Sequence, residues 1–113
     1  MRRIFINPWR DNTRTRSFRQ NIRSEIPYRV DFSKAVADRT GSLTISSVSW
    51  TSTGTRETTI ADKTLTSDVA EATLMSEWGG FGIVRVEATY SDGNTESVYI
   101  KVRFEDLETR RSA

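Results

Sequence analysis

The 113-residue chain contains no cysteine and no histidine. Without cysteine it can form neither a disulfide bond nor a thiolate metal site. Without histidine it lacks the commonest general base and the commonest metal ligand. Carboxylates, hydroxyls and three lysines remain for any chemistry. These absences argue against an enzyme, and no cofactor is expected.

Long apolar runs and clustered metal ligands are also missing. No stretch approaches the roughly 20 apolar residues that a membrane-spanning helix needs, and arginines interrupt the N-terminus where a secretory signal would be apolar. The acidic residues at expected turns are scattered singly, without the alternating spacing of a calcium loop. The sequence therefore predicts no membrane contact and no metal site.

What the sequence does have is a concentration of arginine at its N-terminus. Residues 1–25 hold seven arginines against two acids, a net charge of +5, so the remainder carries −3 of the total charge of +2. The apolar residues of this segment follow neither a helical nor an alternating period, and Pro8 would interrupt a helix or a central strand. We therefore interpret residues 1–25 as a basic extended N-terminal arm outside the folded domain.

The arm combines arginine with apolar anchors and contains no lysine. Arginine pairs carboxylates or phosphates through a planar fork and stacks on aromatic rings. Aromatic side chains supply the buried centre of many protein interfaces. The predicted partner-binding residues are Arg2, Arg3, Ile4, Phe5, Ile6, Trp9, Arg10, Arg14, Arg16, Phe18, Arg19 and Arg23.

Three interpretations of the arm remain. Docking on a partner protein is favoured. Contact with nucleic acid is less favoured, because the rest of the chain is acidic and has no groove-reading helix or zinc-finger pattern. A leader without a specific role is the third.

The rest of the chain reads as short β-strands. Period-two alternation predicts strands at residues 28–32, 44–51, 58–60, 64–66, 69–75, 82–90 and 96–104. Ile45 lies on the opposite parity from Val48 and Trp50, which indicates a bulge near residues 46–47 or a strand start covered by the arm. Between the last two strands, Asp92-Gly93 tolerates the positive φ values of a primed hairpin turn.

This spacing of strands, with an inward-facing Trp50, predicts an all-β chain. The expected fold is an immunoglobulin-like β-sandwich of about seven strands over residues 26–105, held by apolar packing alone. A polar C-terminal tail is expected over residues 106–113.

A glycine-rich segment, Trp78-Gly79-Gly80-Phe81-Gly82, connects two of the predicted strands. Trp78 and Phe81 are candidates for a loop contact with a sugar or a partner. The favoured interpretation is a plain turn whose aromatic ring tucks under the end of the sandwich. The segment matches neither of the glycine-rich patterns that bind nucleotides.

Five pieces of the domain follow a known pattern. They are Val30-Asp31-Phe32, Ile45-Ser46-Ser47-Val48-Ser49-Trp50-Thr51, Ala72-Thr73-Leu74, Gly79-Gly80 and the hairpin from Val84 to Val102. With them, residues 28–104, roughly two thirds of the chain, resemble the fibre-tail adaptors, a family of small tailed-phage proteins. The arginine-rich arm is not a regular part of the family pattern.

The resemblance implies a non-enzymatic virion structural protein that attaches tail fibres to the tail or head–tail connector. Its partners would be other virion proteins, namely tail or connector subunits and the fibre, in a symmetric assembly with several copies of the chain. The protein would be made in the host cytoplasm. Arginines of the arm would pair carboxylates of a neighbouring subunit, and Ile4, Phe5, Ile6 and Trp9 would fill apolar grooves.

Two alternatives stay open. A sandwich with an arm suits a capsid surface equally well, so a capsid decoration or head–tail connector protein is the second structural interpretation. A carbohydrate-binding module that uses Trp78, Phe81 and Tyr99 is the interpretation from a different functional class.

Overall fold

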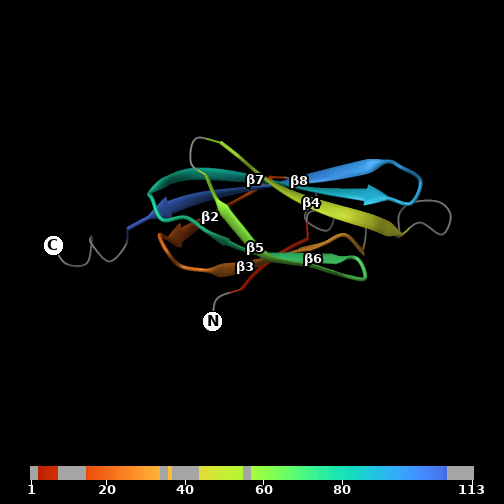
Figure 1. Cartoon of the computed structure of the whole chain (residues 1–113), viewed down its shortest axis with the longest axis horizontal. Coiled ribbons are helices and arrows are strands. Elements are labelled where there is room, and N and C mark those ends of the chain that lie inside the picture. Colours follow the sequence, from red (N-terminus) through yellow and green to blue (C-terminus); the bar gives the residue numbers. More distant parts are fainter. Residues whose placement is uncertain (1–2, 8–14, 34–35, 37–43, 55–56, 107–113) are drawn as a thin grey trace.

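The structure is a computed structural model, and it describes residues 3–7, 15–33, 36, 44–54 and 57–106. These residues form eight strands (Figure 1). The strands are β1 (Ile4–Ile6), β2 (Thr15–Asn21), β3 (Ile26–Asp31), β4 (Ile45–Thr53), β5 (Thr59–Thr66), β6 (Val69–Met75), β7 (Gly80–Tyr90) and β8 (Thr95–Glu105). Within these ranges no helix is long and apolar enough to cross a membrane.

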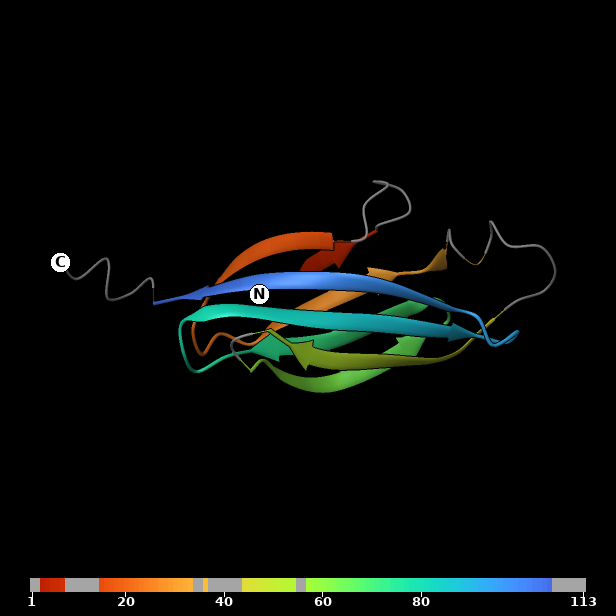
Figure 2. The same cartoon turned by 90° about the horizontal axis from the view of Figure 1, so that it is seen from above.

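The strands form two four-stranded sheets that pack face to face. One sheet has the order β1-β3-β6-β5 and the other the order β2-β8-β7-β4, which Figure 2 shows from above. The predicted all-β sandwich is confirmed. The immunoglobulin-like detail of the expected fold stays a prediction.

The core lies between the sheets, because alternate side chains of the central strands turn inward. Alternation in the strand predicted at residues 28–32 puts Tyr28, Val30 and Phe32 on one face, and none of them has exposed surface. The predicted inward residue Trp50 is 8% exposed. The alternation of β6, β7 and β8 buries Ala70, Ala72, Leu74, Val84, Val86, Ala88, Val98, Ile100, Val102 and Phe104. Apolar alternation thus placed the central strands correctly.

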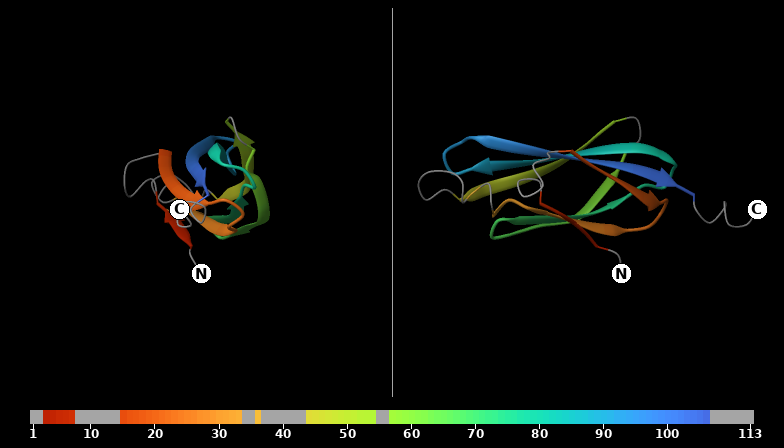
Figure 3. Two further views of the ribbon diagram at one scale, coloured as in Figure 1. Left: turned by 90° about the vertical axis from the view of Figure 1, so that its left-hand side faces the viewer. Right: turned by 180° about the vertical axis from the view of Figure 1, so that it is seen from behind.

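The N-terminal segment differs from its interpretation as an arm outside the domain. Within residues 1–25, β1 pairs in parallel with β3, and β2 pairs in parallel with β8 over seven residues. Each becomes the edge strand of a different sheet, on the side of the sandwich away from β4 and β5 (Figure 3). The described parts of the segment therefore belong to the sandwich.

A buried amide holds β2 in place. Gln20 is 1% exposed, and its Nε2 donates to the backbone oxygens of Ser24 (2.8 Å) and Leu74 (2.9 Å). Its Oε1 accepts a hydrogen bond of 2.8 Å from the Tyr28 hydroxyl. The side chain thus joins β2 of one sheet to β3 and β6 of the other, and its polar atoms are paired as burial requires.

Several local expectations are refined by the structure. The predicted bulge is present between Ile45 and Ser47. The pieces at residues 58–60 and 64–66 are one strand, β5, whose register shifts between Ala61 and Thr64.

The hairpin between β7 and β8 is confirmed, but its predicted primed turn is wrong. Such a turn needs positive φ at both central residues, and here only Gly93 has it (88°). The Gly93 N–H donates to the Tyr90 backbone oxygen at 2.9 Å. The central residues of the turn are therefore Ser91 and Asp92, and Gly93 follows them on the way to β8.

Candidate protein-docking faces

An aromatic ring surrounded by cations lies on the outward face of the β2-β8-β7-β4 sheet. We define the Phe81 face as Arg19 on β2, Phe81 on β7, and Lys101, Arg103 and Glu105 on β8. Phe81 stands directly opposite Arg103 in the antiparallel register, which places Lys101 diagonally across from it. The face thus follows from strand register.

The glycines before Phe81 set its direction. Gly80 has a φ of 136°, a conformation that residues with a side chain rarely adopt. A Cβ atom on Gly79 would lie 3.4 Å from the backbone oxygen of Phe104, so the chain passes close to the end of β8 here. The two glycines therefore let β7 begin with Phe81 turned outward.

Both cations of β8 lie over the Phe81 ring. The Lys101 Nζ is 4.9 Å and the Arg103 Cζ 5.6 Å from the ring centroid, within the range of cation–π attraction. The ring is still 44% exposed. A shallow hollow of about 590 Å³ beside it is lined by Ser17, Phe18, Arg19, Phe81, Lys101 and Arg103. An aromatic surface with positive charge at its rim is thus open to a ligand.

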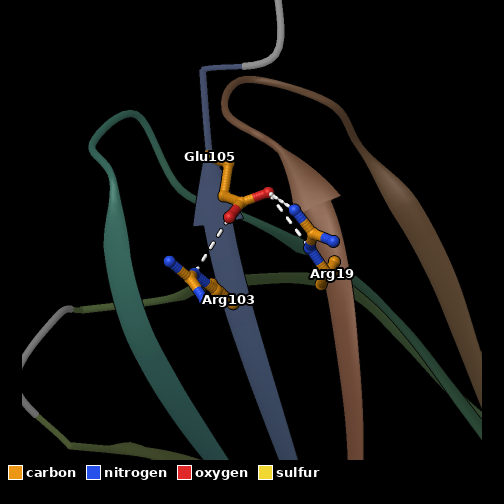
Figure 4. Close-up of polar contacts among 3 residues, drawn as sticks. All are labelled: Arg19, Arg103 and Glu105. Atoms are coloured by element: carbon orange, nitrogen blue, oxygen red, sulfur yellow. Dashed lines mark hydrogen bonds and ion pairs between the residues drawn. The ribbon is translucent and has the colours of Figure 1, made fainter.

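One carboxylate, that of Glu105, orients both arginines of this face (Figure 4). Glu105 accepts hydrogen bonds from Arg19 Nε (3.1 Å) and Nη2 (2.6 Å), and its other oxygen lies 2.9 Å from Arg103 Nε. The Glu105 side chain is 11% exposed, whereas those of Arg19 and Arg103 are 63% and 57% exposed. The arginines are thus held in defined positions while most of each guanidinium side chain faces solvent.

A second cluster of arginine and an aromatic ring lies on the outer face of the other sheet. Phe5 is 64% exposed, and the Arg29 Cζ lies 5.4 Å from its ring centroid. Glu71 pairs with Arg29 at 3.0 Å and with Arg3 at 3.7 Å. We call Arg3, Phe5, Arg29 and Glu71 the Phe5 face. It repeats the composition of the Phe81 face, with one acid between two arginines beside an exposed ring.

The structure separates the predicted partner-binding residues into groups. Arg3 and Phe5 lie on the Phe5 face, and Arg19 lies on the Phe81 face. Arg16 is half-buried with its guanidinium carbon 5.9 Å from the Phe18 ring centroid, and Arg23 is exposed in the turn after β2. Arg2, Trp9, Arg10 and Arg14 lie outside the described residues.

Three predicted anchors serve this chain's own core instead. Ile6 is 1% exposed, and Ile4 and Phe18 pack against the core as half-buried side chains. Phe18 meets the Tyr28 ring edge to face at 5.6 Å. Their inward positions follow from the alternation of β1 and β2, so Ile6 is not available to fill a groove on a partner.

The two aromatic residues of the glycine-rich segment have different surroundings. Trp78 is 67% exposed, in a turn where its N–H donates to the Ser76 hydroxyl (3.3 Å) and that hydroxyl donates to its backbone oxygen (2.9 Å). The expectation that Trp78 or Phe81 tucks under the sandwich end is therefore wrong, since Phe81 is also 44% exposed. Tyr99 lies opposite Arg85, four residues along β7 from Phe81 or about 13 Å, so the rings proposed for a sugar site form no single platform.

Lys101, Arg103 and Glu105 were not among the binding residues predicted from the sequence. The signal was present, because alternation in the predicted strand at residues 96–104 puts Lys101 and Arg103 on the face opposite the apolar residues. The approach of Arg19 to these residues could not be predicted, because β2 pairs with residues 84 positions further along the chain and so brings Arg19 to Glu105. Among the described residues, no group of three acidic side chains is placed to hold a metal ion.

Comparison with known proteins gives a likeness of fold alone. No protein-family model matches the chain, and no curated protein matches it. The crystal structure of the cysteine protease inhibitor EhICP2 from Entamoeba histolytica is similar to this chain with a TM-score of 0.54 at 10% identity, covering 91% of this chain and 95% of that one. The solution structure of amebosin has a TM-score of 0.43 at 11% identity, covering 90% and 97%.

Proposed function

We propose that this chain is a non-enzymatic adaptor of a tailed-phage virion that attaches tail fibres to the tail or head–tail connector. The observation that carries the proposal is the presence of two clusters of arginine and an exposed aromatic ring, one on the outer face of each sheet. An adaptor must bind two partners at once. Faces on opposite sides of a sandwich let two partners bind without competing for one surface.

The chemistry of both faces suits protein partners. Exposed aromatic rings and arginines are enriched at the energetic centres of interfaces. Each arginine already pairs with an acid of this chain, and an acidic segment of a partner would supply further carboxylates to the exposed sides of the same guanidiniums. The resemblance of residues 28–104 to fibre-tail adaptors supports the assignment of the partners as tail or connector subunits and the fibre.

The location of the chain in an intact particle tests the proposal. Cryo-electron microscopy of particles that contain the chain is expected to place it between the tail or connector and the fibres, with protein density against both the Phe5 face and the Phe81 face. Density on the capsid surface and none at the tail would favour the capsid decoration alternative. Contact through one face only would exclude the two-sided adaptor.

Two substitutions separate the faces. Phe5→Ala is expected to weaken one attachment and Phe81→Ala the other, each by about tenfold or more, as truncation of an interface centre does. Trp78→Ala is the matched control, since it removes an aromatic ring that is more exposed than either but lies outside both faces. Equal loss of fibres in all three variants would contradict the assignment of separate faces.

Inhibition of a protease by the end of the sandwich is a second candidate function. The specific observation is Trp78, which a glycine-rich turn presents to solvent at 67% exposure, as a ring that enters a partner's groove would be. The amoebal protein of similar fold is a cysteine protease inhibitor. Titration of papain with the chain tests this function. Stoichiometric inhibition that Trp78→Ala abolishes would establish it, and activity unchanged at 100 µM chain would exclude it.

A further inference from the structure

The four edges of the sheets differ in how well they resist pairing with another strand. Free edges are usually protected by charges, proline, a bulge or short length. β1 has only three residues, β2 carries Arg16 and Arg19, and β5 has Asp62 and Lys63 within its irregular register. β4, Ile45-Ser46-Ser47-Val48-Ser49-Trp50-Thr51-Ser52-Thr53, contains neither a charge nor a proline. Among the described strands, it is the least protected edge.

The bulge in β4 does not protect most of the strand. It lies between Ile45 and Ser47, and from Ser47 to Thr53 the strand pairs with β7 in unbroken register. Seven residues at about 3.3 Å each give a straight edge of roughly 23 Å. This length suffices for a full additional strand.

The direction of the backbone groups of β4 follows from the hairpin of β7 and β8. The Tyr90 N–H donates to the Asn94 oxygen on the β8 side, so the alternate residues of β7 turn their backbone groups toward β4. Residues 47, 49, 51 and 53 stand opposite them and bond to β7. Val48, Trp50 and Ser52 therefore direct their N–H and C=O groups out of the sheet edge.

An incompletely covered apolar margin runs along the same side of the sandwich. Ile45, Val48 and Ile60 pack against the core but stay half-exposed. Leu65 of β5 stands opposite the buried Ala70 yet is 38% exposed. A strand added beside β4 would bring side chains over this margin, so hydrogen bonding and apolar burial would favour the same contact.

We propose that β4 pairs with the β4 strand of a second copy of this chain, antiparallel across a twofold axis, to give one continuous eight-stranded sheet. The interface is self-complementary because an uncharged strand meets an identical uncharged strand. The other copy also supplies Ile45 and Val48 to the apolar margin. The same surface serves both subunits, as a twofold dimer requires.

Charge favours this edge over the other edge of the sheet. Pairing through β2 would place Arg16 and Arg19 of two copies side by side. Pairing through β4 leaves five strand spacings between the two β8 strands, or about 24 Å, so Lys101 and Arg103 of the copies lie well beyond the screening length of about 8 Å at physiological salt. The dimer therefore forms without bringing the basic residues of β8 together.

Sedimentation of the full chain from 1 to 200 µM tests the proposal, with a concentration-dependent dimer expected. Ser49→Lys is expected to weaken dimerisation at least tenfold, because it places a charge on the exposed face of the edge strand. Residue 49 lies opposite Glu87 of β7, so the new lysine is expected to form a cross-strand ion pair that stabilises the folded monomer. The melting temperature of the variant checks this. Thr64→Lys on β5 is the control and is expected to change the dissociation constant less than twofold.

Cross-linking provides a second measurement, since the native chain has no cysteine. Three single-cysteine variants are oxidised, each alone and in pairwise mixtures. The variants are Ser47→Cys, Ser49→Cys and Thr51→Cys. At least one combination is expected to give a disulfide-linked dimer, because facing residues of adjacent strands come within disulfide distance.

Three results would overturn the proposal: a monomer at 200 µM, a dimer that Ser49→Lys leaves intact, or no cross-link from any combination. Fibre loss in the Phe5→Ala and Phe81→Ala particles reports on the adaptor function instead. The two proposals can therefore fail separately.

Discussion

The two edge strands of the β2-β8-β7-β4 sheet are held in opposite ways. β2 is rich in arginine, pairs in parallel with β8, and is anchored inside by the buried amide of Gln20. β4 is uncharged, pairs antiparallel with β7, and is anchored by the buried indole of Trp50. An arginine-rich segment can therefore be as much a part of a sandwich as an uncharged one, provided that its buried polar group is fully paired.

Removal of the N-terminal strands is expected to have the largest effect. A chain that begins at Ser24 loses β1 and β2, and with them the buried or half-buried Ile4, Ile6 and Phe18 and the Gln20 amide. At about 1.5–3 kcal/mol for each large apolar side chain, the loss is on the order of 5 kcal/mol or more, comparable to the whole stability of a small domain. Denaturant unfolding monitored by circular dichroism checks this. An unchanged unfolding midpoint would show that the segment is an independent arm after all.

Truncation of the β4 anchor comes next. Trp50→Ala is expected to cost about 3–5 kcal/mol, because it leaves a cavity under the edge strand. Thr51→Ala, at the neighbouring exposed position, is the control and is expected to stay within about 0.5 kcal/mol. Chemical denaturation of both variants measures the difference. A small effect of Trp50→Ala would mean that β4 is held by its pairing with β7 rather than by its indole.

The β2 anchor is expected to follow with a cost of about 2–4 kcal/mol for Gln20→Leu. The substitution leaves the Tyr28 hydroxyl and the Leu74 oxygen without their partner in the interior, and each unpaired group costs about 1–3 kcal/mol. Ser17→Ala on the exposed face of β2 is the control. A double-mutant cycle with Tyr28→Phe is expected to show coupling, and additive effects would contradict the proposed hydrogen-bond pair.

The smallest effect is expected at Glu105 of β8, on the outer face that β8 shares with β2. Glu105→Gln weakens the ion pairs with Arg19 and Arg103, but those side chains are more than half exposed, so the stability loss should stay below about 1 kcal/mol and shrink in salt. Glu57→Gln provides a matched control at an exposed position. Thermal melts at low and high salt measure both. A loss that salt does not reduce would mean that Glu105 acts through packing rather than charge.

Apolar alternation was sufficient to predict the central strands. Tyr28, Val30 and Phe32 face one way because only one face of β3 is buried, and the same holds for the β7–β8 hairpin. β1 escaped prediction because three residues are too few to show a period, and β2 escaped it because its inward residues are of mixed character. Arg16, Phe18 and Gln20 share the inner side of β2, so no apolar period marks the strand.

The candidate faces were predictable only in part. Arg19, Phe5 and Phe81 were recognised from their residue types, and the outward direction of Lys101 and Arg103 followed from alternation. Lys101 and Arg103 lie beside Phe81 through the antiparallel register of the β7–β8 hairpin. The addition of Arg19 depends on the parallel pairing of β2 with β8, which joins distant segments and carries no local signal. The direct opposition of Phe5 to Arg29 is another product of such pairing.

The parallel pairing of β2 with β8 also sets an order of events during synthesis. The partner of Thr15 is Tyr99 and the partner of Asn21 is Glu105, so β2 cannot pair until the ribosome has synthesised β8. Pairing over such a sequence separation is slow, because a long loop has to close first. Until then β2 is an unpaired strand that other nascent chains could capture. Arginines at positions 14, 16, 19 and 23 are the kind of charges that keep a waiting strand from aggregating.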